Sequence, residues 1–513
     1  MIERSRHPAL CLLLLTVVAV ALSWALSVYG WGVTLPDGNE ELRVQSLISL
    51  DGLRWWLRSA IEDFVGFPAL GASVVMLFAL GLVCHSGLGE AVWRLMAGRF
   101  LAMPAVSLAG VILVGLISGL AGNVGYLCWV PAAALWFRAA GLSPVGGALL
   151  AYVSVGIGCQ TFLPLSAYAD SVTLTTREIA LALAIPLDPT SSWSISAFPF
   201  VSLVLIAFAL FLVTWRMTLP LLHQHQQAPG STPHGRHASS EDRQRLAKVL
   251  SLFTIPRPST LAPAKYELRA LRLVLVVALL YLFLIFLSAS APWGFLRSLA
   301  GDLPHSPFIS SLPLLTALGF AIMGAVYGYA TGRYRHWSDL SDGLTSLSDV
   351  MATYLLITFF ASILTSCLAY SHLDQCLVLA SARGLVSLTS ATGLVLGGWG
   401  PWVLFVIALT FASLASLLMP AASSQWSLLA PVFLPWLYAS AGLSPDVAQS
   451  ALLAGSGLAG TLTPLLAYSP LLLAYVRRFS PVFSYGTLFR RAWPFAMATW
   501  LAWAFVGAFY LLV

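Results

Sequence analysis

Polar residues interrupt some of the most apolar stretches of this chain, at matching places in its two halves. A chain that turns or breaks a helix leaves backbone N–H and C=O groups unpaired, and these groups attract a solute, an ion or water. Polar side chains beside such breaks add hydrogen-bonding groups, so the pattern predicts a binding site for a small solute. The candidate residues are Asn123, Gln160, Thr161 and Pro164 in the first half and Ser423, Ser424, Gln425, Trp426, Ser456, Thr461, Thr463 and Pro464 in the second.

The composition places these residues in a membrane protein. The chain has 513 residues, of which 59% are hydrophobic and 9% are charged, and its mean hydropathy is +0.86. A soluble protein must present a largely polar surface to water, and ordinary soluble domains contain about 25% charged residues. These values exclude a cytosolic enzyme, a nucleic-acid-binding protein and a disordered scaffold. The expected partners are the lipid bilayer and a small organic solute, with no nucleic acid.

Nine apolar segments are long enough to cross the hydrocarbon core, which needs about 20 helical residues. The first, Ala9–Trp31, exceeds the apolar region of a signal peptide, and no clear small-residue cleavage site follows it, so we expect a retained helix. Asp51–Phe64 has apolar residues at helical spacing among charges and predicts an amphipathic helix at the membrane surface. The other predicted spans are 69–87, 145–168, 193–215, 271–291, 309–331, 351–370, 446–476 and 493–513.

Two further apolar stretches, 105–140 and 401–441, are too long for one span and too short for two. Gly122 and Asn123 interrupt the first stretch, and polar residues from Ser423 onward interrupt the second. An irregular turn at membrane depth is tolerated only inside protein or beside water. We therefore expect each stretch to form a re-entrant hairpin whose tip reaches a protein-lined cavity.

An internal repeat relates the two halves. The run AGLSP occurs at 140–144 and again at 441–445, and a shift of 300 residues aligns Thr161–Tyr168 with Thr461–Tyr468. Nine spans would make the two hairpins enter from opposite sides, and inverted repeats with broken helices are typical of secondary transporters. The predicted fold is all-α and polytopic, with about nine transmembrane helices plus two re-entrant hairpins in two inverted repeats. The predicted division is a first repeat over 1–215 with hairpin 105–140, a linker over 216–268 and a second repeat over 269–513 with hairpin 401–441.

Positively charged residues predict the orientation. With the N-terminus in the cytoplasm, 20 of the 26 Lys and Arg residues fall in cytoplasmic segments and 6 fall outside. Because cytoplasmic loops carry the excess of Lys and Arg, we expect a cytoplasmic N-terminus and linker and a periplasmic C-terminus. Histidine pairs in the linker are candidates for metal binding, although a flexible, solvated linker is the plainer interpretation. They are His223, His225, His234 and His237.

Asp170 is the carboxylate nearest to a predicted helix break in the first half. An ionisable residue at membrane depth is costly and is a functional candidate by default, so we expect Asp170 to carry the coupling proton. The alternative is a solvated residue at the outer mouth of the site. His372 and Asp374, beside the span predicted over 351–370, offer a second proton path, although an interfacial position suits them better. H+ is the expected coupling ion and Na+ is the alternative.

Groups for chemical catalysis are missing from the predicted spans. Ser456 lies in a Gly-Ser-Gly run, but a nucleophilic serine needs a base within reach. The only histidine in a predicted span, His85, lies at the cytoplasmic end of that span. The six cysteines show no CxxC spacing, which argues against a zinc site or a disulfide framework. We therefore expect no enzyme, no catalytic residue, no metal and no cofactor.

Four segments resemble the p-aminobenzoyl-glutamate transporter (AbgT) family. They are Leu50–Leu57, Phe64–Gly71, Ser306–Ile309 and Ser423–Pro435, and the similarity keeps their order along the chain. The resemblance implies a bowl-shaped homodimer in which each protomer has nine helices and two hairpins, arranged as an inner dimerising core and an outer transport core. It also implies export or uptake of folate-related aromatic acids and, in some members, sulfonamide efflux driven by the proton gradient.

Charge is lost at several positions that are functional in the family. The family's arginine and aspartate after the second hairpin fall on Leu453 and Ser456, and its acidic residue at the first hairpin tip falls on Asn123. The aspartate of its broken third helix falls on Ala169, next to Asp170. These departures share one direction, toward a less charged cavity. The family's residue types are kept at Ser423, Trp426, Pro445 and Pro464.

The substrate therefore follows less directly from the resemblance than the fold does. An anionic aminobenzoyl-glutamate is best bound by arginine, and between Arg383 and Arg477 the only charged side chain is Asp446. We expect a proton-coupled transporter, such as an antiporter, of the bacterial inner membrane. Its expected cargo is an aromatic or amphiphilic solute of the p-aminobenzoyl-glutamate, p-aminobenzoate or sulfonamide kind. The alternative is a channel or a flippase for a neutral or lipid-like cargo.

Overall fold

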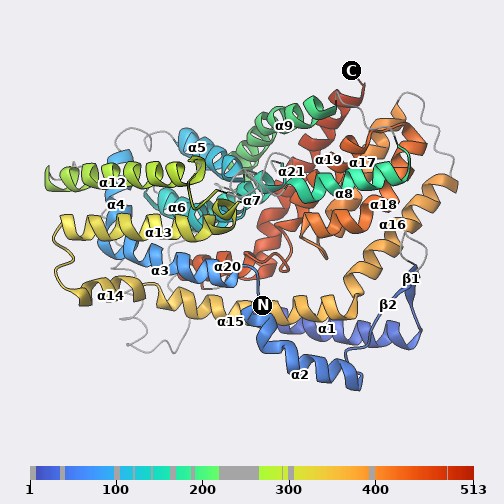
Figure 1. The fold of residues 1–513 in the computed structure, drawn as a ribbon, viewed down its shortest axis with the longest axis horizontal. Helices are drawn as coiled ribbons and strands as arrows, with labels where there is room; N and C mark the ends of the chain where they lie inside the picture. Colours follow the sequence, from blue (N-terminus) through green and yellow to red (C-terminus); the bar gives the residue numbers. More distant parts are fainter. Residues whose placement is uncertain are drawn as a thin grey trace.

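The structure is an assembly of α-helices with one small sheet (Figure 1). Its computed structural model describes residues 7–34, 41–97, 104–119, 122–139, 142–161, 169–185, 191–218, 265–291, 293–297, 306–391, 399–481 and 483–512. Within these ranges six helical segments are long and apolar enough to cross a membrane, so the chain is a polytopic membrane protein. They are Pro8–Val28, Leu50–Ser86, Tyr266–Ser290, Pro307–Ala330, Trp337–Ser371 and Tyr485–Phe509.

Both halves contain a helix pair followed by an interrupted helix and a long helix. The first half comprises α1 (Pro8–Val28), α2 (Leu50–Val65), α3 (Leu70–Ser86), α4 (Leu88–Ala97), α5 (Pro104–Ser118), α6 (Val124–Ala139), α7 (Pro144–Thr161), α8 (Ala169–Ala182) and α9 (Ser191–Val213), which continues as a π-helical turn, Thr214–Thr218. The second half comprises α12 (Lys265–Ser290), α13 (Pro307–Ala330), α14 (Trp337–Thr345), α15 (Ser348–Ser371), α16 (Leu373–Ala391), α17 (Gly400–Ala415), α18 (Ala422–Ala441), α19 (Pro445–Gly460), α20 (Ser469–Phe479) and α21 (Tyr485–Leu512).

Three of the long apolar helices lie together at one end of the molecule. In Figure 1, α12, α13 and α3 lie side by side on the left, α14 and α15 run beneath them, and α1 lies further to the right. Helices α8, α17, α18 and α19 form the opposite end, and α7 lies between the two groups. Most of α12 is exposed, including Leu279, Phe283 and Phe286. A helix with so large an apolar exposed surface requires lipid or another apolar surface around it.

Three of the four helices in the two helix pairs are short. Helix α5 has 15 residues, and α6 and α17 have 16 each. At about 1.5 Å per residue each spans about 22–24 Å, which is less than the hydrocarbon thickness of about 30 Å. The pairs α5–α6 and α17–α18 occupy the two stretches that the sequence predicts as hairpins.

Glycines let α7 approach its neighbours closely. A Cβ atom added to Gly119, just after α5, would lie 2.1 Å from the carbonyl carbon of Gly158 in α7. A Cβ added to Gly158 would lie 2.3 Å from the carbonyl oxygen of Leu116. Small residues at crossings bring backbones together where lipid offers no competing hydrophobic force between helices. The first helix pair is therefore held against α7 at backbone distance.

The amphipathic helix predicted over Asp51–Phe64 is confirmed as α2. Its apolar residues Leu53, Trp56, Leu57 and Ile61 are all exposed, as expected for a helix that lies on the membrane surface. The Ser49 side chain caps its first turn by accepting a hydrogen bond from the Gly52 N–H. On the opposite face Trp55 stacks on Tyr370 of α15, with ring centroids 4.3 Å apart.

The break predicted within 446–476 is present, since two helices, α19 and α20, are separated by an irregular segment over 461–468. Two features differ from the sequence prediction. Two short strands, β1 (Gly32–Thr34) and β2 (Glu41–Arg43), pair in antiparallel fashion beyond α1. A 19-residue helix, α16, occupies a segment that the prediction treated as an outer connection. Its buried residues recur every third position, which is the signal that would have revealed it: Leu373, Cys376, Leu379 and Ala382.

Candidate functional site

A cavity of about 670 Å³ lies where the tips of the two helix pairs meet. The tip of the first pair contributes Gly122 and Asn123, and the segment that breaks α19 from α20 contributes residues 465–468. Helices α15 and α16 close another side. Its volume is within the range of small-molecule sites, about 300–1,000 Å³. The remaining lining residues are Phe67, Pro68, Cys159, Thr365, Ser366, Leu368, Ala369, Asp374, Gln375, Leu418, Met419, Pro420, Ala421, Ala422, Ser423 and Ser424.

Each tip is held by a side chain from the interrupted helix of its own half. In the first half Gly122 adopts a left-handed conformation, φ +63°, and its carbonyl oxygen accepts a hydrogen bond from the Cys159 Sγ at 3.1 Å. In the second half Thr463 Oγ1 donates to the Leu417 carbonyl at 2.7 Å. These side chains satisfy tip carbonyls that a helix would otherwise bond, which keeps both irregular turns in shape beside the cavity.

Three of the predicted site residues lie on the cavity wall: Asn123, Ser423 and Ser424. All three side chains are exposed, and they come from the two different halves of the sequence. The structure thus brings together the two helix-pair tips that the sequence singles out. Pro464 immediately precedes the lining residues 465–468, and its carbonyl accepts a hydrogen bond from Ser469.

Five other predicted residues are buried away from the wall, where their polar atoms are bonded within the protein. Gln425 Nε2 donates to the Ala412 carbonyl at 2.9 Å and joins the two helices of the second pair. The Ser456 and Thr461 hydroxyls donate to carbonyls of their own helix, at Leu453 and Leu458. In these places the residues stabilise local structure and offer no free group to a solute. The five residues are Gln425, Trp426, Ser456, Thr461 and Thr463.

Trp426 is packed between helices of both halves rather than on the cavity wall. Its side chain is 1% exposed, and its indole Nε1 donates to Thr176 Oγ1 of α8 at 2.9 Å. The Thr176 hydroxyl in turn donates to the Gln449 side chain of α19. The hydrogen-bonded group connects α8, α18 and α19, which identifies a packing role for Trp426 in this arrangement.

Four predicted site positions cannot be compared in full. Pro164 lies outside the described residues. Gln160 and Thr161 end α7, and Asp170 begins α8, but the described part of the chain does not include their side chains. The proposed roles of these four residues therefore stay predictions.

Asp374 lies on the cavity wall, whereas the sequence favoured an interfacial position for it and gave it, with His372, only as a second proton path. It lies in the first turn of α16, three residues beyond the apolar segment Trp337–Ser371. Its Oδ1 is buried without a hydrogen-bond partner. Burial raises the pKa of Asp374, whereas the backbone N–H groups of Gln375 and Asp374 and the neighbouring His372 act in the opposite direction. The position of Asp374 on the wall depends on tertiary structure, because α16 turns toward the tips only after His372 ends α15 in a left-handed conformation, φ +54°.

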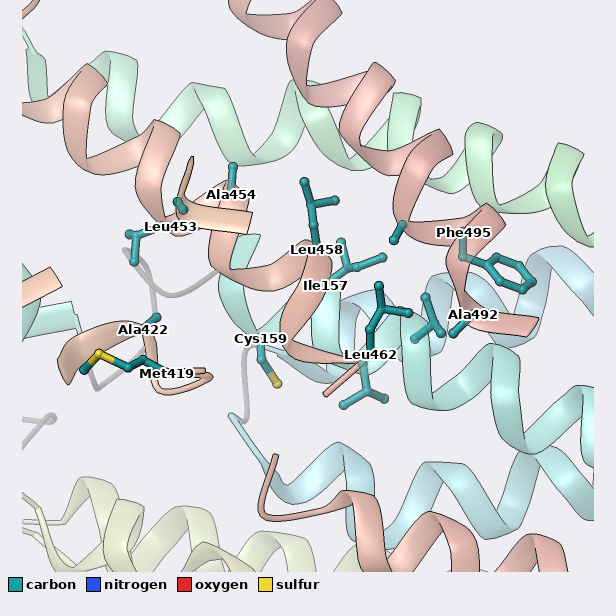
Figure 2. Close-up of a cluster of buried hydrophobic side chains, with 14 of the residues drawn as sticks. Ile157, Cys159, Met419, Ala422, Leu453, Ala454, Leu458, Leu462, Ala492 and Phe495 are labelled. Carbon is teal, nitrogen blue, oxygen red and sulfur yellow. The ribbon is translucent and has the colours of Figure 1, made fainter. Parts of the chain in front are cut away.

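One of the positions at which charge is lost, Leu453, lies in an apolar cluster behind the cavity. Leu453 is 3% exposed and belongs to the cluster that also contains Ile157 of α7 and Phe495 of α21 (Figure 2). Cys159 and Met419, also labelled in Figure 2, belong both to this cluster and to the cavity wall. An arginine at Leu453 would be a charge among apolar side chains and would require a buried partner. With leucine and serine at 453 and 456, the cluster needs no such partner.

Aromatic rings join the halves beside the cavity. Tyr126 of α6 stacks on Tyr468, a lining residue, with ring centroids 4.9 Å apart and an angle of 9° between the rings. Close by, a Cβ added to Gly156 of α7 would lie 2.2 Å from Thr461 Cγ2 and 2.7 Å from the Tyr126 hydroxyl. Helices α6 and α7 of the first half therefore touch the break of the second half without space between them.

A metal centre is not indicated within the described ranges. Among those residues no group of three or more His, Cys, Asp or Glu side chains is placed to hold a metal ion. The linker histidines, His223 to His237, fall outside the described part of the chain. Their role as metal ligands stays a hypothesis that this structure does not address.

A polytopic helical protein whose solute-sized cavity joins interrupted helices of two similar halves has the architecture of a membrane transporter. The chain belongs to the AbgT putative transporter family, whose model matches residues 3–513. The members of this family are transporters rather than enzymes. The resemblance stated from the sequence and the prediction that the chain is not an enzyme are therefore confirmed.

Known relatives cover nearly the whole chain. It is 25% identical over 511 residues to the p-aminobenzoyl-glutamate transport protein of Escherichia coli (strain K12), covering 98% of this chain and 92% of that protein. Its structure is similar to that of the YdaH transporter of Alcanivorax borkumensis, with 26% identity, a TM-score of 0.50 and 98% of each chain covered. A further solved structure is that of MtrF of Neisseria gonorrhoeae, which represents a class of antimetabolite efflux pumps. It is 25% identical with a TM-score of 0.48, covering 99% of this chain and 96% of that chain.

Proposed function

We propose that this protein is a secondary active transporter that binds an organic solute in the cavity between the two helix-pair tips. The observation that carries the proposal is the convergence of Asn123, Ser423 and Ser424 on one cavity of about 670 Å³. The polar side chains at both tips can bind a polar cargo, and the surrounding wall is mostly apolar, which suits an aromatic or amphiphilic solute. By analogy with the Escherichia coli relative, p-aminobenzoyl-glutamate is the first cargo to test, and p-aminobenzoate and sulfonamide-like compounds follow from the family resemblance.

Alternating access is the mechanism that this arrangement favours. We propose two inverted repeats in which α5–α6 and α17–α18 are re-entrant hairpins, supported by the short lengths of α5, α6 and α17. Movement of one hairpin at a time would expose the same cavity first to one side and then to the other. The division into repeats over 1–215 and 269–513 belongs to this proposal.

Filling the cavity should abolish transport without unfolding the protein. Ser423 is exposed on the wall, so in Ser423→Trp the indole would occupy the space of the cargo. We expect uptake into proteoliposomes to fall at least about tenfold, since a ring in a site of this size displaces a ring-sized ligand. The matched control is Ser427→Trp, one turn further along α18, at an exposed position outside the cavity lining. Equal transport by both variants would contradict the proposed site.

A channel or a flippase for a neutral or lipid-like cargo is the second candidate function. The observation that favours it is the sparse charge of the cavity, where Asp374 is the only charged side chain among the described lining residues. A coupled carrier accumulates its solute against a concentration difference when an ion gradient is imposed, whereas a channel only equilibrates it. Accumulation in proteoliposomes that disappears with an ionophore would exclude both a channel and an uncoupled flippase.

We propose H+ as the coupling ion, with Na+ as the alternative. From the sequence, Asp170 is the proposed proton carrier because it is the carboxylate nearest to the predicted helix break of the first half, and Asp374 with His372 is the second candidate. Asp170→Asn would then lose pH-gradient-driven accumulation while keeping exchange of cargo, because a neutral side chain can still cycle through both conformations. Full accumulation in that variant would exclude Asp170 and direct attention to Asp374.

The orientation that we propose has the N-terminus and the linker in the cytoplasm and the C-terminus in the periplasm of a bacterial cell, based on the distribution of Lys and Arg. A cysteine introduced by Ser239→Cys, in a background without the six native cysteines, should not react with a membrane-impermeant thiol reagent in intact cells. It should react after the cells are permeabilised. Labelling in intact cells would reverse the orientation of the whole chain.

The proposed assembly is a homodimer, which follows from the family resemblance. The exposed apolar faces of α12 and α13 are available for lipid or for a second protomer. Native mass spectrometry of the purified protein distinguishes a dimer from a monomer directly.

A further inference from the structure

We propose that the cavity selects an organic cation, such as a protonated aromatic amine, and that the Asp374 carboxylate is the group that binds it. This inference rests on the proposed transport function and names the chemical class of the cargo. It differs from the expectation drawn from the family resemblance, in which the cargo is an anionic aromatic acid.

The first reason is the charge of the cavity wall. Among the described lining residues Asp374 is the only one with a charged side chain, and the wall contains no described lysine or arginine. An anionic cargo would therefore meet a carboxylate and no fixed cation, which disfavours its binding at this site. A cation would meet an opposite charge in a confined space where water screens little.

The second reason is that Asp374 is not already neutralised by a protein partner. Its Oδ1 is buried and has no hydrogen-bond partner. The Nδ1 atom of His372, two residues earlier, is also buried without a hydrogen-bond partner. A buried carboxylate without an opposite charge is costly, and the hydrogen bonds that Asp374 accepts from the N–H groups of its own first turn do not supply one. The positive charge of a bound cargo would supply it.

The charged groups of the neighbouring elements are engaged elsewhere or are weak acids. Strand β2 touches α16 through the Leu42 carbonyl, which accepts a hydrogen bond from the Cys376 thiol, and its Arg43 and Glu41 form a salt bridge with each other at 2.8 Å. Helix α18, which also packs on α16, carries no charged residue. Next to Asp374 itself the titratable side chains are those of His372 and Cys376. Among the described side chains next to Asp374, only that of His372 can carry a positive charge.

Aromatic side chains supply a second feature that suits a cation with a ring. Phe67 and Tyr468 both line the cavity, and Tyr468 is held in place by its stack with Tyr126. The face of an aromatic ring attracts ammonium groups, and the ring also packs against apolar cargo. A protonated aromatic amine can use both the carboxylate and the rings, whereas an aromatic acid gains only from the rings.

The same carboxylate can couple cation movement to protons by mutually exclusive occupancy. When the cation binds from one side, the protonated carboxyl of Asp374 gives its proton to water on that side and pairs with the cation. After the cavity opens to the other side, the carboxyl takes up a proton from water there and the cation leaves. One proton moves opposite to one cation, so a pH gradient drives exchange.

The test is equilibrium binding to the purified full-length protein in lipid nanodiscs. Three radiolabelled aromatic probes of similar size differ in charge: benzyltrimethylammonium is a permanent cation, 4-aminobenzoate is an anion and benzamide is neutral. We expect the cation to bind most tightly and to bind more weakly as the pH is lowered, because protons then compete for Asp374. In Asp374→Asn its affinity should fall about tenfold or more, as expected for loss of a charge pair in a confined site, and its pH dependence should disappear.

Two variants separate recognition from folding and from general helix electrostatics. Asp374→Glu keeps the charge and should retain cation binding. Asp446→Asn is the matched control, because Asp446 also lies in the first turn of a helix, α19, but does not line the cavity. Its affinity for the cation should be unchanged.

The outcomes distinguish this inference from the proposed function. Tighter binding of 4-aminobenzoate than of benzyltrimethylammonium, or no binding of the cation at millimolar concentration, would overturn the choice of cargo class. Cation binding that Ser423→Trp abolishes but Asp374→Asn leaves intact would keep the cavity as the site and exclude Asp374 as its cation-binding group. Cation binding that survives both substitutions would place the solute outside the cavity and contradict the proposed function as well.

Discussion

Trp426→Ala is expected to lower the free energy of unfolding by about 3–5 kcal/mol, the usual cost of replacing a fully buried tryptophan by alanine. The side chain is 1% exposed and its indole N–H is bonded to Thr176 across the two halves. Removing it leaves a cavity between α18 and α8, and the Thr176 hydroxyl loses the donor that it accepts from. The measurement is the thermal unfolding temperature of the purified protein in detergent, together with its elution volume on size exclusion.

Trp426→Phe is the matched control, since it keeps most of the ring volume and loses only the hydrogen bond. Its cost should be about 1 kcal/mol, and its transport activity should remain close to that of the wild type. If Trp426→Ala instead yields a fully stable protein that fails only in transport, Trp426 contacts cargo in another conformation. That result would return Trp426 to the solute-binding residues that the sequence predicts.

Gly156→Ala should destabilise the contact between the two halves although alanine is the better helix former. The added Cβ would lie 2.2 Å from Thr461 Cγ2 and 2.7 Å from the hydroxyl of Tyr126. Overpacking of this kind costs about 1–3 kcal/mol, which exceeds the gain of about 0.5–1 kcal/mol from replacing a helical glycine. Because the break at Thr461 leads into the cavity lining, we also expect transport to fall. Unfolding temperature and initial rates of uptake are the two measurements.

Gly110→Ala is the control for this substitution. Gly110 lies within α5, and a Cβ there would sit 3.7 Å from the Trp136 ring, an ordinary contact distance. It should raise the stability slightly, by about 0.4–1 kcal/mol. Combining Gly156→Ala with Thr461→Ser removes the methyl group that the new Cβ meets and should recover part of the loss. Identical behaviour of the two alanine variants would show that α7 and the second break have room to separate.

Local features of the amino-acid sequence were sufficient to predict most of the fold. Spanning helices require about 20 apolar residues, so their existence follows from composition along the chain, and α1, α13 and α15 begin and end close to the predicted limits. The amphipathic helix α2 follows from the spacing of its apolar residues. The repeat of AGLSP and of the T-x-x-P breaks identified both helix-pair tips, and Asn123, Ser423 and Ser424 do line one cavity.

Burial was the property that the sequence prediction could not supply for the remaining site residues. A polar residue near a helix break can face a cavity or can bond a neighbouring helix, and its type is the same in both cases. Gln425, Ser456 and Thr463 form hydrogen bonds within the protein instead of facing the cavity. Their partners are the carbonyls of Ala412, Leu453 and Leu417, respectively. Such neighbours depend on how helices cross, which no spacing rule along the chain contains.

Asp374 is the reverse case, because the sequence favours a solvated position and the fold places the residue on the cavity wall. In the sequence it follows the span predicted over 351–370 and belongs with interfacial residues, because charge beside an apolar run is usually solvated. In the folded chain the left-handed His372 turns α16 back toward α18, and the carboxyl group becomes part of the wall opposite the second tip. Composition and periodicity thus specified which helices form and where they are interrupted. The side chains that meet at the cavity were specified by the packing of α7, α15, α16 and α18, since contacts between distant segments arise only when the helices assemble.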